Sequence, residues 1–280
     1  MSEYANPNAL VETDWLASHY GDDGYRVVEV DVDTNSYAEG HIPGAVGWNW
    51  TLDLQRQVQR DIPTQEEWET LLSKAGISND TKVLLYGDNH NWFAAFAYWL
   101  FKMYGHDHVQ IVNGGRAKWI AEGRETTTDV PSYPETNYKA KPADTSIRAL
   151  REDVAATIGN DSTALIVVRS PAEFAGELLA PPNLPQEGAQ RGGHVPGAGN
   201  VPWATAVQEN STFKSADDLR KIYGDKGVTT GKPTIAYCRI GERSAHTWFV
   251  LKELIGNEDV KNYDGSWTEW GSLIGAQIER

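Results

Sequence analysis

The chemistry of this chain is expected at its single cysteine, Cys238. It lies in residues 234–244, which read Thr-Ile-Ala-Tyr-Cys-Arg-Ile-Gly-Glu-Arg-Ser. The apolar first part predicts a strand that carries Cys238 at its carboxyl end, and Ser244 is placed to be the N-cap residue of the next helix. Loop N–H groups and the positive end of that helix would then point at one place, where a thiolate or an anion is stabilised. We therefore expect Cys238 to have a lowered pKa and to act as a nucleophile.

The residues that follow Cys238 suit the binding of an anion. Arg239 and Arg243 bracket the loop, where they would stabilise the thiolate and neutralise an anionic substrate. Four residues would supply the backbone of the loop: Ile240, Gly241, Glu242 and Ser244. The alternative is that Cys238 is a buried structural cysteine, because free cysteines are among the most buried residues.

The composition limits the partners and the cofactors. The 39 acidic and 25 basic residues give a formal net charge of -14, which disfavours a nucleic acid or an anionic membrane as partner. A single cysteine excludes an intramolecular disulfide, a cysteine-rich zinc site and a two-cysteine redox pair, so we expect no metal and no other cofactor. The apolar runs are too short to span a bilayer and residues 1–10 do not resemble a secretory signal, so a cytoplasmic location is expected.

The chain repeats itself. His-Ile-Pro-Gly-Ala at residues 41–45 returns as His-Val-Pro-Gly-Ala at residues 194–198. Matching strands and helices are predicted around each copy: strands over 26–32 and 165–169, strands over 82–86 and 234–237, and helices over 92–104 and 244–255. Strands that alternate with helices predict an α/β fold, with one mostly parallel sheet flanked by helices in each half.

The repeat also sets the expected domain boundaries. The first domain is expected over residues 1–124 and the second over residues 148–280. Residues 125–147 are rich in Thr, Pro, Tyr and Lys without a helical period, so they are interpreted as the linker. A second irregular stretch, residues 180–193, is expected to be a long loop inside the second domain.

Three motifs together resemble the tandem-domain rhodanese family. They are the paired His-x-Pro-Gly-Ala motifs, the strand-Cys-loop-Arg-helix segment, and the closing Asp-Gly-Ser-Trp-Thr-Glu-Trp of residues 264–270. The active loop Cys-Arg-Ile-Gly-Glu-Arg is similar to that of the family's thiosulfate sulfurtransferases. The resemblance implies that only the second domain is catalytic. Gly87 stands opposite Cys238 in the repeat, and residues 88–91 contain no cysteine and no arginine.

The resemblance also implies a mechanism. The Cys238 thiolate would attack the outer sulfur of thiosulfate, sulfite would leave, and the persulfide would pass its sulfur to cyanide or to a thiol. Arg243 is the first candidate for holding the anionic donor, and Arg239 is the second. The resemblance further suggests that Arg169 helps to hold the active loop and that Arg191 binds substrate.

Two departures from the family pattern stand out. A valine replaces the aspartate of the family's Asp-Val-Arg motif. The animal thiosulfate enzymes have basic residues where this chain has Glu173 and Ile240, which leaves the preferred sulfur donor open.

Three alternative functions remain open at this stage. A cysteine phosphatase is disfavoured, because such loops are one residue longer than the four residues that separate Cys238 from Arg243 here. A 3-mercaptopyruvate sulfurtransferase would be similar in length and domain plan, but the active loops of those enzymes are less cationic. A sulfur-carrier protein loaded by a desulfurase would accept one sulfur atom and deliver it by protein contact.

Overall fold

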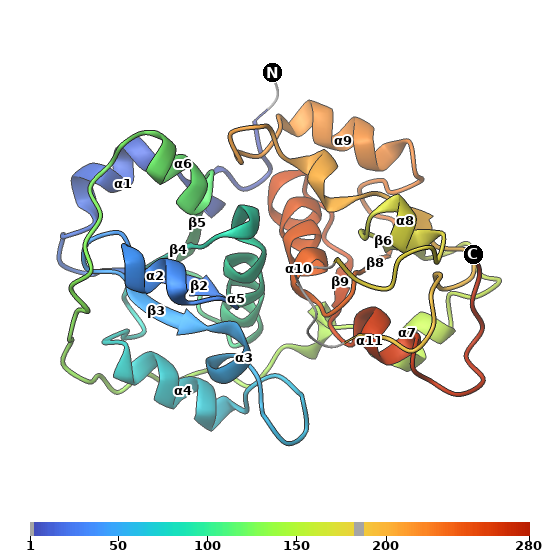
Figure 1. The fold of residues 1–280 in the computed structure, drawn as a ribbon, viewed down its shortest axis with the longest axis horizontal. Helices are drawn as coiled ribbons and strands as arrows, with labels where there is room; N and C mark the ends of the chain where they lie inside the picture. The colour runs from blue at the N-terminus through green and yellow to red at the C-terminus, as the bar shows by residue number, and fades with distance from the viewer. Residues whose placement is uncertain (1–2, 182–187) are drawn as a thin grey trace. The chain divides into compact units, whose positions relative to one another are not determined.

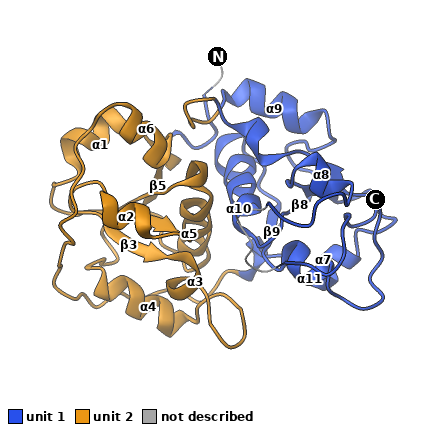
Figure 2. Ribbon diagram, in the orientation of Figure 1, with its two compact units in different colours: residues 1–7, 145–208, 214–280 blue, residues 8–144, 209–213 orange. Residues whose placement is uncertain are grey.

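The computed structural model describes residues 3–181 and 188–280. The chain forms two compact units, which Figure 2 colours separately. Unit 2 comprises residues 8–144 and 209–213, and unit 1 comprises residues 1–7, 145–208 and 214–280. Part of the loop that the sequence predicts over 180–193, residues 182–187, lies outside the described residues.

Unit 2 is built on a sheet with strand order β1-β5-β4-β2-β3, in which every pairing is parallel. Its strands are β1 (Leu10–Val11), β2 (Tyr25–Asp31), β3 (Val46–Asn49), β4 (Lys82–Tyr86) and β5 (Val109–Val112). Its helices are α1 (Thr13–His19), α2 (Asn35–Glu39), α3 (Trp50–Asp53), α4 (Gln65–Lys74), α5 (Trp92–Met103) and α6 (Gly115–Ala121). Helix α5 contacts β2, β4 and β5. All its residues except Lys102 are buried, as expected of a helix that is apolar on every side.

Residues 125–144 belong to unit 2 and contain no helix and no named strand. Hydrogen bonds attach them to the end of α5. The Lys141 N–H donates to the Tyr104 carbonyl at 3.1 Å, and the Asp144 N–H donates to the Met103 carbonyl at 2.8 Å. The side chain of Tyr138 is buried.

Unit 1 is built on a second all-parallel sheet, with strand order β7-β6-β8-β9. Its strands are β6 (Ala164–Val167), β7 (Gly199–Asn200), β8 (Thr234–Tyr237) and β9 (Val260–Tyr263). Its helices, seen in Figure 1, are α7 (Arg151–Ala155), α8 (Pro171–Phe174), α9 (Ala216–Gly224), α10 (Glu242–Phe249) and α11 (Ser266–Trp270). Every residue of β6 and β8 is buried, because parallel strands covered on both faces are apolar throughout.

The two halves repeat a specific brace between strand and turn. Tyr86 ends β4, and its hydroxyl accepts a hydrogen bond from the Ile42 N–H at 3.0 Å. Tyr237 ends β8, and its hydroxyl accepts from the Val195 N–H at 3.0 Å. Ile42 and Val195 occupy the same position in the two His-x-Pro-Gly-Ala motifs. The repeated sequence therefore has a repeated structural role.

The motif histidines are also held alike. The His41 Nδ1 lies 2.9 Å from the Tyr37 carbonyl, and its ring stacks on that of Tyr37. The His194 Nδ1 lies 2.9 Å from the Phe174 carbonyl, and its ring stacks on that of Phe174. Each histidine thus ties its turn to a short helix that precedes it, α2 in unit 2 and α8 in unit 1.

The predicted α/β fold with a parallel sheet in each half is confirmed. One local prediction is wrong. Helix α10 begins at Glu242, and its N-cap residue is Gly241, so Ser244 lies inside the first turn and is not the N-cap. Gly241 is the N-cap residue because the turn into the helix requires a φ of +104°, which a glycine adopts readily.

Candidate active site

Cys238 follows the last residue of β8 and lies at the carboxyl end of the sheet. The Cys238 N–H donates to the Ser266 hydroxyl at 3.0 Å, and the Cys238 carbonyl accepts from the Trp267 N–H at 3.1 Å. Next along the chain, the Arg239 carbonyl accepts from the Thr268 N–H at 2.9 Å. The cysteine is therefore fixed between β8 and the start of α11, and its side chain is fully buried.

The loop closes tightly over the cysteine sulfur. The Gly241 N–H donates to Cys238 Sγ at 3.1 Å. The Gly241 carbonyl accepts from the Ser244 hydroxyl at 3.1 Å and from Asn262 Nδ2 at 3.3 Å. A Cβ on Gly241 would lie 2.9 Å from the Asp264 Cα, so this position has no room for a side chain. A backbone N–H at the start of α10 therefore points at the cysteine sulfur.

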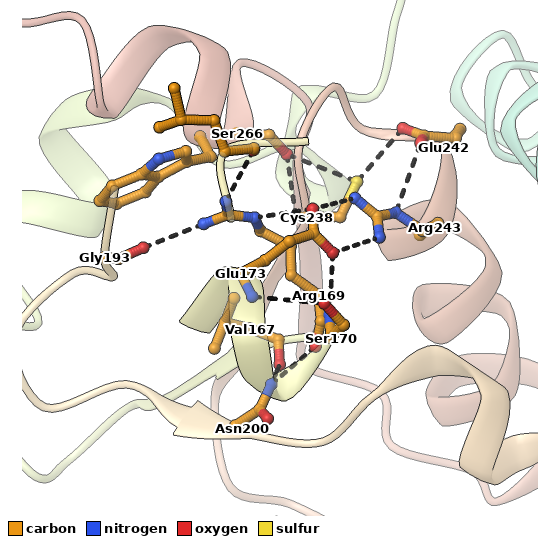
Figure 3. A network of polar contacts seen from close by, with 12 residues as sticks. Val167, Arg169, Ser170, Glu173, Gly193, Asn200, Cys238, Glu242, Arg243 and Ser266 are labelled. Atoms are coloured by element: carbon orange, nitrogen blue, oxygen red, sulfur yellow. Dashed lines mark hydrogen bonds and ion pairs between the residues drawn. The ribbon is translucent and has the colours of Figure 1, made fainter. Parts of the chain in front are cut away.

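The side chain of Glu242 lies beside the thiol. The Cys238 Sγ–H donates to Glu242 Oε2 at 3.2 Å, and Glu242 is buried (Figure 3). The expectation of a lowered pKa for Cys238 is therefore wrong in this geometry. Burial raises the pKa of the thiol and the Glu242 carboxylate raises it further, while Arg243 and the Ser244 and Gly241 N–H groups act in the opposite direction.

Arg243 is held by the carboxylate of Glu173, which lies in α8, the helix after the neighbouring strand β6. Its Nη1 and Nη2 donate to Glu173 Oε2 and Oε1 at 3.0 and 3.1 Å, and its Nε lies 3.5 Å from Glu242 Oε1. On the other side, Arg169 Nε donates to Glu173 Oε1 at 3.3 Å (Figure 3). Burial alone would raise the pKa of Glu173, but Arg243, Arg169 and the Ser170 N–H outweigh it and lower the pKa to about 2. Glu173 is therefore an ionised link between two buried arginines.

The comparison with known proteins decides the family. Residues 12–122 and residues 150–273 each match the rhodanese-like domain. The chain belongs to the rhodanese family. A Saccharopolyspora erythraea protein provisionally named a thiosulfate sulfurtransferase is 57% identical over 270 residues, which cover 96% of this chain and 95% of that protein. A Haloferax volcanii protein with the same provisional name is 54% identical, and the match covers 100% of this chain and 98% of that protein.

A third relative has a different name. The sulfur carrier protein TtuD of Thermus thermophilus is 53% identical, over 99% of this chain and 98% of that protein. Among solved structures, wild-type EanB superposes with a TM-score of 0.85 at 24% identity, over 100% of this chain and 70% of that chain. The likeness to EanB shows a shared fold.

The two arginines that lie further along the chain from Cys238, Arg169 and Arg191, have structural partners. Arg169 donates to the Gly193 carbonyl at 2.9 Å and to the Leu179 carbonyl at 3.1 Å, and it lies over the Trp267 ring. Arg191 donates through Nε to the Gly271 carbonyl at 3.1 Å and through Nη2 to the Leu273 carbonyl. Both guanidinium groups thus hold backbone segments of unit 1. Arg239 is buried beside Cys238.

In the first rhodanese-like region Gly87 takes the position that Cys238 has in the second. Gly87 follows β4, and its N–H donates to Asn91 Oδ1 at 3.0 Å. A Cβ on Gly87 would lie 2.4 Å from the Val30 carbonyl oxygen. The packing of unit 2 therefore excludes a side chain, and with it a cysteine, at this position.

Three contacts of the loop are not predicted by the sequence. They are the Glu242 carboxylate beside the Cys238 thiol, the Glu173 carboxylate bound by Arg243, and the Ser266 hydroxyl that accepts from the Cys238 N–H. Glu173 had a readable signal, because Ser170-Pro-Ala-Glu173 has the spacing of a capping box, and the Ser170 N–H does donate to Glu173 Oε2 at 2.9 Å. Its pairing with Arg243 had no local signal.

Two features are absent from residues 3–181 and 188–280. No group of three or more His, Cys, Asp or Glu side chains there is placed to hold a metal ion. No helix there is both long enough and apolar enough to cross a membrane.

Proposed function

We infer that this protein is a sulfurtransferase that moves a sulfane sulfur from thiosulfate to a thiol acceptor, or to cyanide in assays, through a persulfide on Cys238. The observation that carries the inference is the Gly241 N–H, 3.1 Å from the sulfur of the chain's only cysteine at the start of α10. A persulfide formed on Cys238 would carry a negative charge, and the loop N–H groups and the start of α10 would stabilise that charge. The two relatives named for thiosulfate support the choice of donor.

The transfer takes place in two displacements at sulfur. The Cys238 thiolate attacks the outer sulfur of thiosulfate, the bond between the two sulfur atoms of thiosulfate breaks, and sulfite leaves with the electron pair. The acceptor then attacks the terminal sulfur of the persulfide, and the Cys238 thiolate leaves. Arg239 and Arg243 are the two positive charges nearest to Cys238 along the chain. We assign both arginines to the anionic donor and the sulfur anion, with Arg243 first, because Glu173 holds its guanidinium group in place in the loop.

A sulfur carrier is the second candidate, and one observation favours it. A relative that is 53% identical over nearly its whole length is named a sulfur carrier protein. A carrier would form the same Cys238 persulfide but would receive the sulfur from a protein and deliver it to a protein. The cytoplasmic location stays a prediction from the sequence.

Intact mass spectrometry tests the proposal on the wild-type protein and on Cys238→Ser. The wild type, incubated with thiosulfate, is expected to gain the mass of one sulfur atom and to lose it when cyanide is added, with thiocyanate formed over many turnovers. Cys238→Ser is expected to gain nothing. Loading by 3-mercaptopyruvate in place of thiosulfate would change the donor, and loading without repeated turnover would favour the carrier. A protein that no donor loads would refute the persulfide.

A further inference from the structure

The side chain of Glu242 is aimed at the reacting atom. Its Oε2 lies 3.2 Å from Cys238 Sγ, and both side chains are buried. The two residues lie four positions apart, where the loop turns into the first residue of α10. A thiol removed from water in this way needs a group inside the protein to take its proton, because the thiolate is the nucleophile.

The charges behind Glu242 alternate along one line of contacts. Glu242 Oε1 lies 3.5 Å from Arg243 Nε, Arg243 binds Glu173 by two hydrogen bonds, and Glu173 contacts Arg169 (Figure 3). While the thiol keeps its proton, the two carboxylates and the two guanidinium groups of this line balance each other in charge. Loss of the thiol proton to solvent would add an uncompensated negative charge to a buried site. Transfer of the proton to Glu242 would leave the number of charges unchanged.

Other ionisable side chains packed around the loop are differently engaged. They come from the segments that follow β6 and β9, from α8, from α10 and from the loop itself, and they are Asp264, Glu173, Arg169, Arg243, Arg239 and His246. Asp264 is bound through both oxygens by Arg148 at 2.8 Å, and Glu173 is bound through both oxygens by Arg243. Unlike Asp264 and Glu173, Glu242 has an oxygen that accepts a hydrogen bond from the Cys238 thiol.

We propose that Glu242 is a catalytic base that takes the proton of Cys238 and keeps it inside the site during sulfur transfer. The idea rests on the proposed function for the identity of the sulfur donor.

The proton and the electrons balance in each step. First, the Sγ–H bond breaks and the proton moves to Glu242 Oε2, giving a thiolate beside a neutral carboxyl group. The thiolate attacks the outer sulfur of thiosulfate, and sulfite leaves with the electron pair of the broken bond. The Glu242 carboxyl now donates a hydrogen bond toward the cysteine sulfur. When an acceptor removes the outer sulfur, the thiolate returns and takes its proton back from Glu242.

The pH dependence of alkylation tests this assignment without any sulfur donor. Cys238 is the only cysteine, so the mass gained from iodoacetamide reports on Cys238 alone. If the proton stays on Glu242, the shared pair loses no proton over the neutral range, and the wild-type alkylation rate is expected to stay nearly constant from about pH 6 to about pH 8. In Glu242→Gln the proton must go to water, so the rate is expected to rise about tenfold per pH unit below the pKa of the thiol.

A matched control separates this effect from a general loss of charge. Glu258 is exposed and pairs with Lys252, and Glu258→Gln is expected to keep the flat profile of the wild type. The proposal is overturned if the wild type itself rises about tenfold per pH unit, with Glu242→Gln parallel to it. It is also overturned if the wild-type thiol reacts at no pH. Should Glu242→Gln fail to fold, the slope of the wild-type profile decides the question alone.

Sulfur loading, followed by mass, separates this proposal from the proposed function. Wild-type loading by thiosulfate is expected to follow the flat alkylation profile, and Glu242→Gln is expected to load faster as the pH rises. If thiosulfate loads neither protein, the proposed donor is wrong, while the two alkylation slopes still decide the role of Glu242.

Discussion

Arg243 donates two parallel hydrogen bonds, at 3.0 and 3.1 Å, to the carboxylate of Glu173. The arginine that closes the active loop is thus fixed to α8, on the connection that follows the neighbouring strand β6. A bidentate arginine-carboxylate pair sets both distance and orientation. The position of the loop over Cys238 therefore depends on a residue that lies far upstream in the chain.

Glu173→Gln is expected to destabilise unit 1 by about 3 to 5 kcal/mol, because it leaves the buried charges of Arg243 and Arg169 without their carboxylate. Denaturant unfolding measures the loss. Glu177→Gln, on the exposed face just after α8, is the control and is expected to change the free energy of unfolding by less than about 0.5 kcal/mol. If both substitutions change the free energy of unfolding by the same small amount, Glu173 does not stabilise the buried arginines as described.

The same carboxylate predicts how stability depends on pH. Folding lowers the pKa of Glu173 to about 2, so its contribution is fully present above the pKa of the unfolded chain and is lost as the pH falls. The shift corresponds to about 3 kcal/mol, lost between about pH 5 and about pH 2. Unfolding free energies measured at several pH values should show the wild type approaching Glu173→Gln in this window. A difference that stays constant down to pH 2 would contradict the shift.

Gly241→Ala is expected to abolish sulfur loading and to cost more than about 1 kcal/mol of stability, because φ is +104° and the added Cβ would lie 2.9 Å from the Asp264 Cα. Gly231→Ala is the matched control, since Gly231 also has a positive φ, of +87°, but has no atom within 4 Å of the added Cβ. Loading measured by intact mass should survive in the control. Normal loading in Gly241→Ala would show that the loop tolerates a side chain.

Gly87→Ala tests why unit 2 has no cysteine at the matching position. The added Cβ would lie 2.4 Å from the Val30 carbonyl oxygen, so the strands must move apart, at an expected cost of about 1 to 3 kcal/mol. Gly21→Ala has open space around its Cβ and no positive φ, and it is expected to be nearly neutral. Thermal unfolding compares the two. If Gly87→Ala is as stable as the control, the exclusion of a side chain is not steric.

Local sequence determined much of this protein. The repeated His-x-Pro-Gly-Ala motifs and the apolar strands gave two parallel α/β units, because strand and helix periods are properties of short segments. The same local reasoning placed Cys238 at the end of β8, in a short loop before a helix. It failed by three residues at the N-cap, which is Gly241 with its positive φ and not Ser244.

The partners of the loop were decided only by the tertiary structure. Glu173 reaches Arg243 across 70 positions of sequence because β6 pairs with β8, which brings the connection after β6 beside the connection after β8. Burial of Cys238 raises the pKa of the thiol, and the Glu242 carboxylate, which lies just after the turn at Gly241, raises it further, against the direction expected from the sequence. Charge interactions act through space, so a sequence that shows which charges are present does not show which of them meet.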